Sequence, residues 1–147
     1  MKRVYTSGTY DLFHIGHLNV IRRSRELGDF LVVGVSTDEL VASYKMRKPI
    51  IPFEDRAEII RALTGVDLVV RQEELFSPKL MSELEIDVMT IGDDWKGKYH
   101  PGLEWAQNHP KIEMAFLPYT QSVSTTVIKR QNSNRWQDDQ RADFAKA

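Results

Sequence analysis

The sequence contains no cysteine, which excludes disulfide bonds, thiolate zinc sites and cysteine nucleophiles. It also has no apolar run long enough to cross a bilayer, and Met1-Lys2-Arg3 leads straight into a strand pattern instead of a signal peptide. The formal net charge is −1 and the pI is near 6.4, so the chain lacks the overall basic field of a nucleic-acid-binding protein. We therefore expect a cytoplasmic protein that binds neither a membrane nor a polynucleotide.

A chain of 147 residues, 41% of them hydrophobic, is large enough for one domain with a buried core. Strand-like apolar runs alternate with periodic helix-like runs, which is typical of a parallel sheet covered on both faces. We predict an α/β, Rossmann-like fold with a parallel five-stranded sheet and helices on both faces. Residues 1–130 form the domain and residues 131–147 a polar C-terminal tail. The strands are expected at 4–6, 30–36, 66–70, 86–91 and 111–117, and helices at 16–27, 53–63 and 78–84.

The stretch from Gly8 to His17, GTYDLFHIGH, lies between the first strand and the first helix. A helix that begins near Gly16 offers free N–H groups and a positive dipole end, and glycine lets an anion approach that backbone. His14 and His17 flank this point, so both imidazoles can donate hydrogen bonds to one phosphate. A metal pair is the alternative, but no cysteine or Glu-x-x-His spacing completes a ligand set. Ordinary surface histidines are the other alternative.

Basic residues follow the second strand. Lys45, Arg47 and Lys48 are predicted to lie on a mobile loop that leaves the same sheet edge as the histidines, where a triphosphate needs countercharge. A solvated basic loop is the alternative. Arg56, on the next helix, either fastens this loop to the body or is a surface charge. Polar residues at the end of the second strand, Ser36 and Asp38, are expected near the site.

Two further motifs follow strand patterns. Gly92-Asp93-Asp94-Trp95 comes after the fourth strand, and its carboxylates could bind Mg²⁺, cap a helix or accept from an exocyclic amine; Trp95 could also be a core residue. After the fifth strand, the hydroxyl-rich segment Ser124-Thr125-Thr126 begins a helix. These hydroxyls either cap that helix or turn a second helix N-terminus toward the phosphates.

Together these motifs resemble the cytidylyltransferases of the HxGH nucleotidyltransferase superfamily, and most closely the bacterial glycerol-3-phosphate cytidylyltransferases. The resemblance extends to about Lys129 and rests on the Gly8–His17 stretch, Ser36-Thr37-Asp38-Glu39, Gly92-Asp93-Asp94-Trp95 and Ser124-Thr125-Thr126. It implies transfer of CMP from CTP to a small phosphorylated alcohol, best glycerol 3-phosphate, with release of pyrophosphate. It also implies a homodimer and Mg²⁺ carried with CTP, without a metal site formed by side chains.

The resemblance assigns roles to residues of this chain. It implies His14, His17 and Lys45 as catalytic residues, and Lys45 and Lys79 as acceptor-binding residues. The implied nucleotide-binding residues are Thr9, Tyr10, His14, Gly16, His17, Arg47, Asp94, Trp95, Tyr119, Thr120, Ser124, Thr125 and Thr126.

Two departures leave the substrates open. Tyr119 and Thr64 stand where the family has arginines, so cations that would meet phosphate are missing. The segment from Lys48 to Arg56 instead looks like the nucleotidyltransferase domain of ADP-heptose enzymes, and a lesser resemblance is to archaeal FAD synthetase. The alternatives are therefore CTP-dependent transfer to another polyol phosphate or a phosphonate, ATP-dependent adenylyl transfer to a sugar 1-phosphate or a flavin precursor, and a catalytically inactive nucleotide-binding regulator.

Overall fold

The β-branched and aromatic runs of the sequence form one sheet of five parallel strands in the computed structural model, which describes residues 1–118, 120 and 128. The strands are β1 (Arg3–Gly8), β2 (Phe30–Ser36), β3 (Leu68–Gln72), β4 (Val88–Gly92) and β5 (Glu113–Leu117). The helices are α1 (Ile15–Arg25), α2 (Asp38–Lys45), α3 (Phe53–Arg61), α4 (Pro78–Glu83) and α5 (Pro101–Gln107), and a 3₁₀ turn η1 spans Asp93–Trp95. The predicted α/β class and five-stranded parallel sheet are confirmed.

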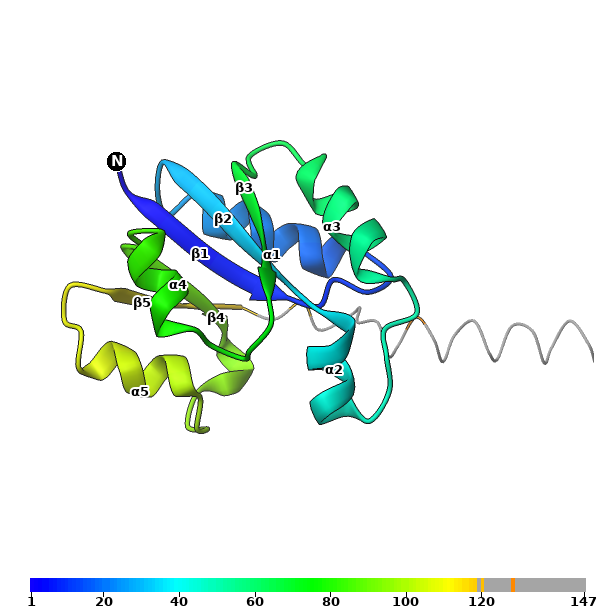
Figure 1. Cartoon of the computed structure of the whole chain (residues 1–147). Helices are drawn as coiled ribbons and strands as arrows, with labels where there is room; N and C mark the ends of the chain where they lie inside the picture. The colour runs from blue at the N-terminus through cyan, green and yellow to red at the C-terminus, as the bar shows by residue number, and fades with distance from the viewer. Residues whose placement is uncertain (119, 121–127, 129–147) are drawn as a thin grey trace, which may run out of the picture.

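The strand order is β3-β2-β1-β4-β5 (Figure 1). From β1 the chain moves outward through β2 to β3 and then crosses back to place β4 beside β1, where Val4 pairs with Val88 and Tyr5 with Met89. The direction of winding therefore reverses between β1 and β4. Side chains and loops that follow these two strands meet at this point, outside the carboxyl edge of the sheet.

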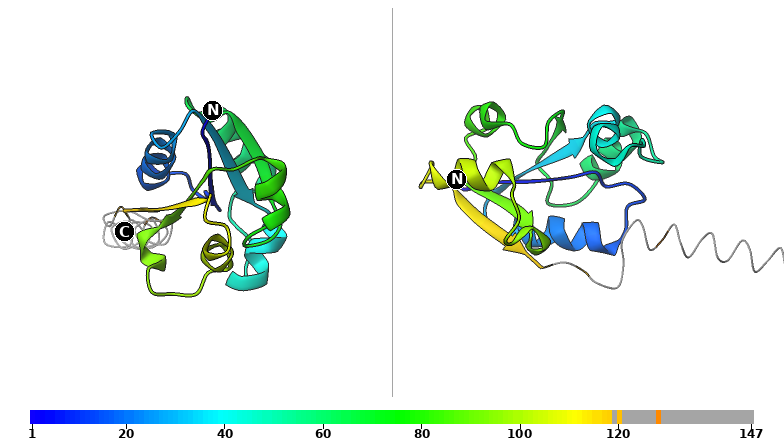
Figure 2. Two further views of the ribbon diagram at one scale, coloured as in Figure 1. Left: turned by 90° about the vertical axis from the view of Figure 1, so that its left-hand side faces the viewer. Right: turned by 90° about the horizontal axis from the view of Figure 1, so that it is seen from below.

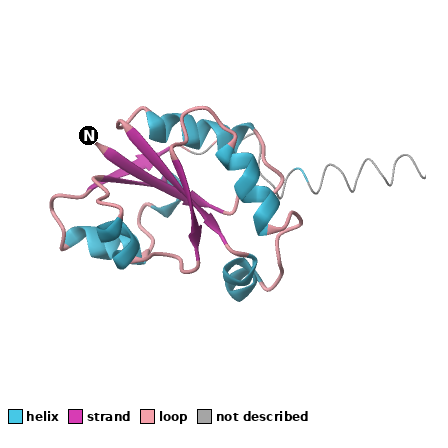
Figure 3. Cartoon of the chain, turned by 45° about the horizontal axis from the view of Figure 1, so that its top comes forward, coloured by secondary structure: helices cyan, strands magenta, loops and turns pink. Residues whose placement is uncertain are grey.

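Helices cover both faces of the sheet (Figure 3). Alternate residues of the central strands point to opposite sides, and they are apolar on both, so each face needs a covering layer. On one face, Leu31, Val33 and Val35 of β2 pack with residues of α1 and α3; on the other, Val32 packs with Met81 of α4. Figure 2 shows α1 and α4 on opposite sides of β1. Strand β2 is therefore buried on both faces.

Element boundaries differ from the predicted ones by a few residues, and two helices, α2 and α5, were not predicted. Strand β3 begins at Leu68 instead of Val66. Asp67 lies in the connection before it, where its backbone N–H donates to Leu31 O and its carboxylate accepts from Leu31 N–H. Among the described residues, no helix has the length and apolar character needed to span a membrane.

Candidate active site

A cleft of about 420 Å³ opens beside the carboxyl ends of β1 and β4. It therefore lies at the reversal of strand order, where open α/β sheets bind their ligands. The residues that line it are Ser7, Gly8, Thr9, Tyr10, Asp11, His17, Val20, Val41, Lys45, Arg47, Lys48, Pro49, Gly92 and Asp94. Parts of the first motif, the basic segment and the fourth-strand motif thus meet in one place.

The loop between β1 and α1 forms one wall of the cleft, and its backbone is strained. Tyr10 and Leu12 have φ values of +57° and +48°, a region in which a non-glycine residue costs on the order of 1–3 kcal/mol. Packing holds the loop there. The Tyr10 side chain is buried in the core, and a Cβ added at Gly8 would lie 3.0 Å from Tyr10 Cζ. Burial raises the pKa of the Tyr10 hydroxyl above its ordinary value, so this side chain stays neutral.

His14 and His17 cap α1 with their imidazole rings. His14 Nδ1 accepts from the N–H of Gly16 at 3.1 Å, and His17 Nδ1 accepts from the N–H of His14 at 3.2 Å. This reciprocal pair is a capping box formed by two histidines, and their ring centroids are 3.8 Å apart in a stacked arrangement. Because each Nδ1 accepts a hydrogen bond, each neutral ring carries its proton on Nε2, and we assign the tautomers on this basis.

Both imidazoles are neutral at pH 7. Burial lowers the pKa of His17 to about 4, with the neighbouring His14 lowering it further and Asp11 opposing the shift. Burial also lowers the pKa of His14. His17 lines the cleft and His14 stacks on it, so the two rings supply Nε2–H donors beside the positive end of α1.

The prediction that Lys45 lies on a loop is wrong, because Lys45 is the last residue of α2. This helix forms after Thr37, whose Oγ1 accepts from the N–H of Leu40 at 3.1 Å, and two acidic residues in the first turn favour its N-terminus. It ends where Met46 adopts a left-handed conformation with φ +61°.

Arg47 and Lys48 lie on the loop after α2, as predicted, and both line the cleft together with Lys45. Three cations therefore face the space that His17 lines. A cleft with this lining suits a ligand that carries several negative charges.

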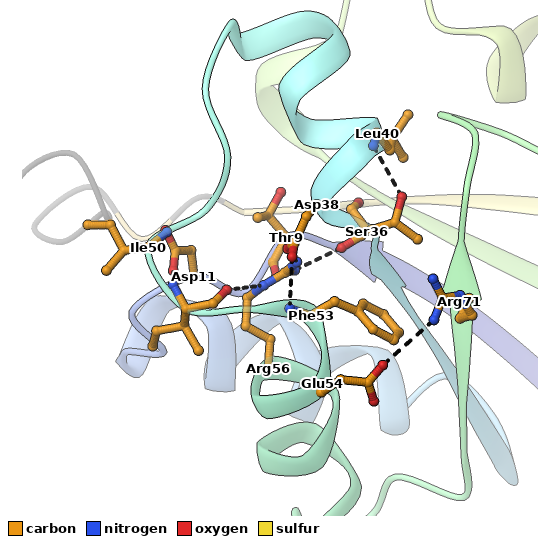
Figure 4. Close-up of polar contacts among 12 residues, drawn as sticks. Thr9, Asp11, Ser36, Asp38, Leu40, Ile50, Phe53, Glu54, Arg56 and Arg71 are labelled. Carbon is orange, nitrogen blue, oxygen red and sulfur yellow. Dashed lines mark hydrogen bonds and ion pairs between the residues drawn. The ribbon is translucent and has the colours of Figure 1, made fainter.

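Arg56 fastens the basic loop to the body of the protein, one of the two roles considered for it. Its side chain is buried, and its Nε donates to the carbonyl of Ile51 at 2.8 Å. One terminal nitrogen donates to the carbonyls of Thr9 at 2.6 Å and Ser36 at 2.8 Å, and the other pairs with Asp38 Oδ1 at 2.6 Å (Figure 4). Ser36 and Asp38 thus act near the site, as expected, by holding this arginine.

The residues of the Gly92-Asp93-Asp94-Trp95 motif lie in different surroundings. Asp94 lines the cleft, and Gly92 leaves it room, because a Cβ at Gly92 would contact Asp94 Oδ1. Trp95 is half-buried and meets His100 edge-on, with 4.8 Å between ring centroids. Trp95 is thus neither fully buried in the core nor part of the cleft lining in this structure, so the expectation that it contacts a nucleotide stays a prediction.

Several predicted site residues lie elsewhere or cannot be placed. Lys79 lines a separate pocket of about 190 Å³ beside β3 and α4, where its Nζ lies 3.7 Å from Glu83 Oε1. Thr120 Oγ1 accepts from Asn19 of α1 at 3.4 Å, which places the exit of β5 over that helix. Tyr119, Ser124, Thr125 and Thr126 lie outside the described residues, as does the tail 131–147.

Sequence reasoning missed two apolar residues of the cleft wall, Val20 and Val41. Val20 belongs to the first helix but was not identified as facing the site. Val41 was missed because α2 was not predicted, although Thr37 followed by Asp38 and Glu39 is a helix-start signal.

The cleft fits a magnesium ion that arrives on a polyphosphate. In the part of the chain that the structure describes, no group of three or more His, Cys, Asp or Glu residues is placed to hold a metal ion. Asp94 supplies one carboxylate at the cleft, which suits Mg²⁺ because this ion commonly combines one or two carboxylates with phosphate oxygens and water.

Comparison with known proteins agrees with this geometry. A family model described as cytidylyltransferase-like matches residues 5–131. A glycerol-3-phosphate cytidylyltransferase from Bacillus spizizenii is 39% identical over 132 residues, which is 88% of this chain and 96% of that protein. An FAD synthase from Pyrococcus abyssi is 42% identical over 134 residues, covering 87% of this chain and 90% of its own length.

A solved structure of a lipopolysaccharide core biosynthesis protein from Thermoplasma volcanium superposes with a TM-score of 0.66 at 29% identity. The match covers 82% of this chain and 97% of that one, so nearly the whole neighbour shares the fold. The family model includes the carboxyl ends of both strands that flank the cleft, the histidine pair and the basic segment. With its sequence and its site in agreement, the chain belongs to the cytidylyltransferase-like family.

Proposed function

We propose that this protein transfers CMP from CTP to glycerol 3-phosphate, giving CDP-glycerol and pyrophosphate. The observation that carries the proposal is the pair of neutral Nε2–H donors at the start of α1, beside three cations of one cleft. The relative from Bacillus spizizenii, which matches over nearly its full length, supports the choice of both substrates.

In this proposal the triphosphate of CTP lies along the N-terminus of α1. His14 and His17 donate to the α-phosphate, while Arg47 and Lys48 neutralise the charge of the remaining phosphates and Lys45 meets the phosphate of the acceptor. Asp94 would help to hold Mg²⁺ bound with CTP, and the ion would supply positive charge that offsets the charge of the phosphates. Thr9 and Asp94 lie within reach of the same ligand in the cleft.

The reaction needs no side-chain nucleophile. An oxygen of the acceptor phosphate attacks the α-phosphorus of CTP, a new P–O bond forms, and the bond to the bridging oxygen of pyrophosphate breaks. The attacking oxygen is already largely ionised at neutral pH, because the second pKa of a phosphate monoester is about 6. Catalysis is then positioning together with stabilisation of the charge that develops on the transferred group.

Adenylyl transfer is the second candidate, and a specific observation favours it. The FAD synthase of Pyrococcus abyssi is as similar to this chain as the cytidylyltransferase is, so overall identity does not select the donor nucleotide. The Gly92-Asp93-Asp94-Trp95 motif supports CTP. The loss of two arginines, at Thr64 and Tyr119, is the feature that points to a changed substrate.

The experiment is an assay of pyrophosphate release with Mg²⁺ and either CTP or ATP. The acceptor panel contains glycerol 3-phosphate, other polyol phosphates, sugar 1-phosphates, FMN and a small phosphonate, and a His14→Ala, His17→Ala double variant serves as the blank. Turnover with CTP and glycerol 3-phosphate supports the proposal, whereas turnover with ATP alone overturns it. Turnover with CTP and only another acceptor keeps the donor and replaces the acceptor.

The homodimer and the cytoplasmic location stay predictions. Sedimentation equilibrium of the purified chain tests the dimer, which a single monomeric species would contradict.

A further inference from the structure

The basic loop between α2 and α3, residues 46–52, has little packing to hold it in place. Met46 is 89% exposed and Ile50 is 60% exposed, although both are apolar. Arg47 and Lys48, which line the cleft, are exposed as well. A segment that buries so little apolar surface gains little hydrophobic stabilisation, so its position depends on polar contacts.

Two buried charged side chains supply those contacts. Asp11 accepts from the N–H of Ile50 through Oδ2 and from the N–H of Ile51 through Oδ1, both at 2.9 Å. Arg56 holds the carbonyl of Ile51 with its Nε at 2.8 Å. Figure 4 shows Asp11 beside Ile50, next to Arg56. The backbone at Ile50 and Ile51 is therefore fixed at three points by charge-assisted hydrogen bonds.

The same two residues also act on the other wall of the cleft. Asp11 is part of the strained loop between β1 and α1, and Arg56 donates to the carbonyl of Thr9 in that loop at 2.6 Å. Arg56 further binds the carbonyl of Ser36 and the carboxylate of Asp38, where β2 leads into α2. The Arg56 guanidinium thus holds both ends of the segment that carries the cations. Through the carbonyl of Thr9 it also connects this segment to the loop that precedes the histidine pair.

We propose that Arg56 and Asp11 are positioning residues that set the separation between the cations of the basic loop and the phosphate-facing start of α1. This inference rests on the proposed function in that the ligand bridging the two walls is a nucleoside triphosphate. Arg56 is not part of the cleft lining, so it acts on that ligand only through the backbone that it holds. Loss of the guanidinium leaves the cations present but lets them move away from the phosphates, so nucleotide binding weakens more than the chemical step.

The test compares Arg56→Lys with Arg61→Lys, a matched control on the same helix whose side chain is half-exposed and pairs only with Glu58 among the described residues. Lysine keeps the charge but cannot reach four acceptors in the planar arrangement of arginine. We expect KM for CTP to rise about tenfold in Arg56→Lys, with kcat changed less than about threefold, because hydrogen bonds to a charged group are lost. Arg61→Lys should retain both constants.

Limited trypsin digestion without nucleotide supplies a readout that does not depend on activity. Cleavage after Lys45 and Arg47, identified by mass spectrometry, should be about tenfold faster in Arg56→Lys than in Arg61→Lys because the loop opens more often. Inorganic tripolyphosphate should slow it in the unmodified protein. Asp38→Asn, which removes the ion pair of Arg56 but leaves its three carbonyl acceptors in place, should show a smaller change in the same direction and replaces Arg56→Lys if that variant does not fold.

Unchanged cleavage and unchanged KM in both Arg56→Lys and Asp38→Asn would overturn the proposal. A lower melting temperature without either change would assign Arg56 a purely structural role and overturn it too. The outcome is separable from the proposed function: a chain that uses ATP instead of CTP, or another acceptor, still shows the faster cleavage if the two residues position the loop.

Discussion

The two walls of the cleft are built by different means. The loop between β1 and α1 is fixed by burial and helix capping, since Tyr10 lies in the core and the two histidines close the start of α1. The basic loop is fixed by Asp11 and Arg56, while its Met46 and Ile50 side chains face solvent. The first wall carries donors that must be aligned closely for chemistry. The second carries long cations that attract charge, and their position acts on nucleotide binding more than on the chemical step.

The largest effect on kcat is expected when the imidazole donors of the first wall are removed. His17→Ala should lower kcat by roughly 10²- to 10³-fold, or about 3–4 kcal/mol, as for a lost oxyanion donor, and His14→Ala should do the same. The measurement is kcat for pyrophosphate release at saturating CTP. His100→Ala is the matched control because His100 caps α5 with the same Nδ1 contact, to Gly102, but does not line the cleft.

His14→Ser separates the two duties of His14. Serine keeps an acceptor for the N–H of Gly16 but has no Nε2–H. We expect a folded protein with a melting temperature near that of the unmodified chain and the same large loss of kcat. Retained turnover in both His14→Ser and His17→Ala would refute the role of the imidazoles.

Removal of single cations from the second wall should have a smaller effect and act mainly on binding. Arg47→Ala should raise KM for CTP, and Lys45→Ala should raise KM for the acceptor, each by roughly 10- to 100-fold because one charge-assisted contact is lost. Steady-state kinetics with each substrate varied in turn checks this. Lys79→Ala provides the comparison, since its side chain lies outside the cleft; a rise in acceptor KM in this variant would place the acceptor in the separate pocket beside β3 and α4.

The difference in packing between the walls is tested by stability. Gly8→Ala pushes a methyl group against the Tyr10 ring and should lower the free energy of unfolding by about 1–2 kcal/mol, as overpacking does. Ile50→Ser on the other wall should change it by less than about 0.5 kcal/mol, because that side chain is exposed. Urea unfolding followed by circular dichroism compares them, and equal losses would mean that both walls depend on packing.

This contrast also explains what the sequence could predict. The Gly8–His17 stretch is contiguous, so its spacing placed the start of α1 within one residue and identified the residues of the first wall. The sheet followed from apolar runs such as 30–36, which need no partner to be recognised. For the anchors of the second wall, the sequence offered fastening of the loop as one of two roles for Arg56, but it could not give the contacts, because Asp11 meets residues about 40 positions away and Arg56 meets Thr9 47 positions away.

Helix α2 was missed for another physical reason. It has only 8 residues, too few for a clear apolar stripe, and it is fixed by the Thr37 cap and by the fold around it. The capping role of the two histidines was likewise not predictable from spacing alone. Histidine at these positions suggests a phosphate contact, and only the ring orientation shows that Nδ1 faces the backbone and leaves Nε2 as the donor.

The smallest effect concerns pH and again distinguishes the walls. Burial lowers the pKa of His17 to about 4, below the ordinary value of 6.5, so between these values the unfolded chain binds a proton that the folded chain does not. Stability is therefore complete above pH 6.5 and falls as the pH drops toward 4, by on the order of 1 kcal/mol after allowance for solvent screening. Melting temperatures between pH 7.5 and 4.5 measure this slope. The slope of melting temperature against pH should be shallower in His17→Asn than in the unmodified protein. In Arg47→Ala, on the second wall, the slope should match that of the unmodified protein. Equal slopes in all three proteins would show that His17 does not titrate with folding.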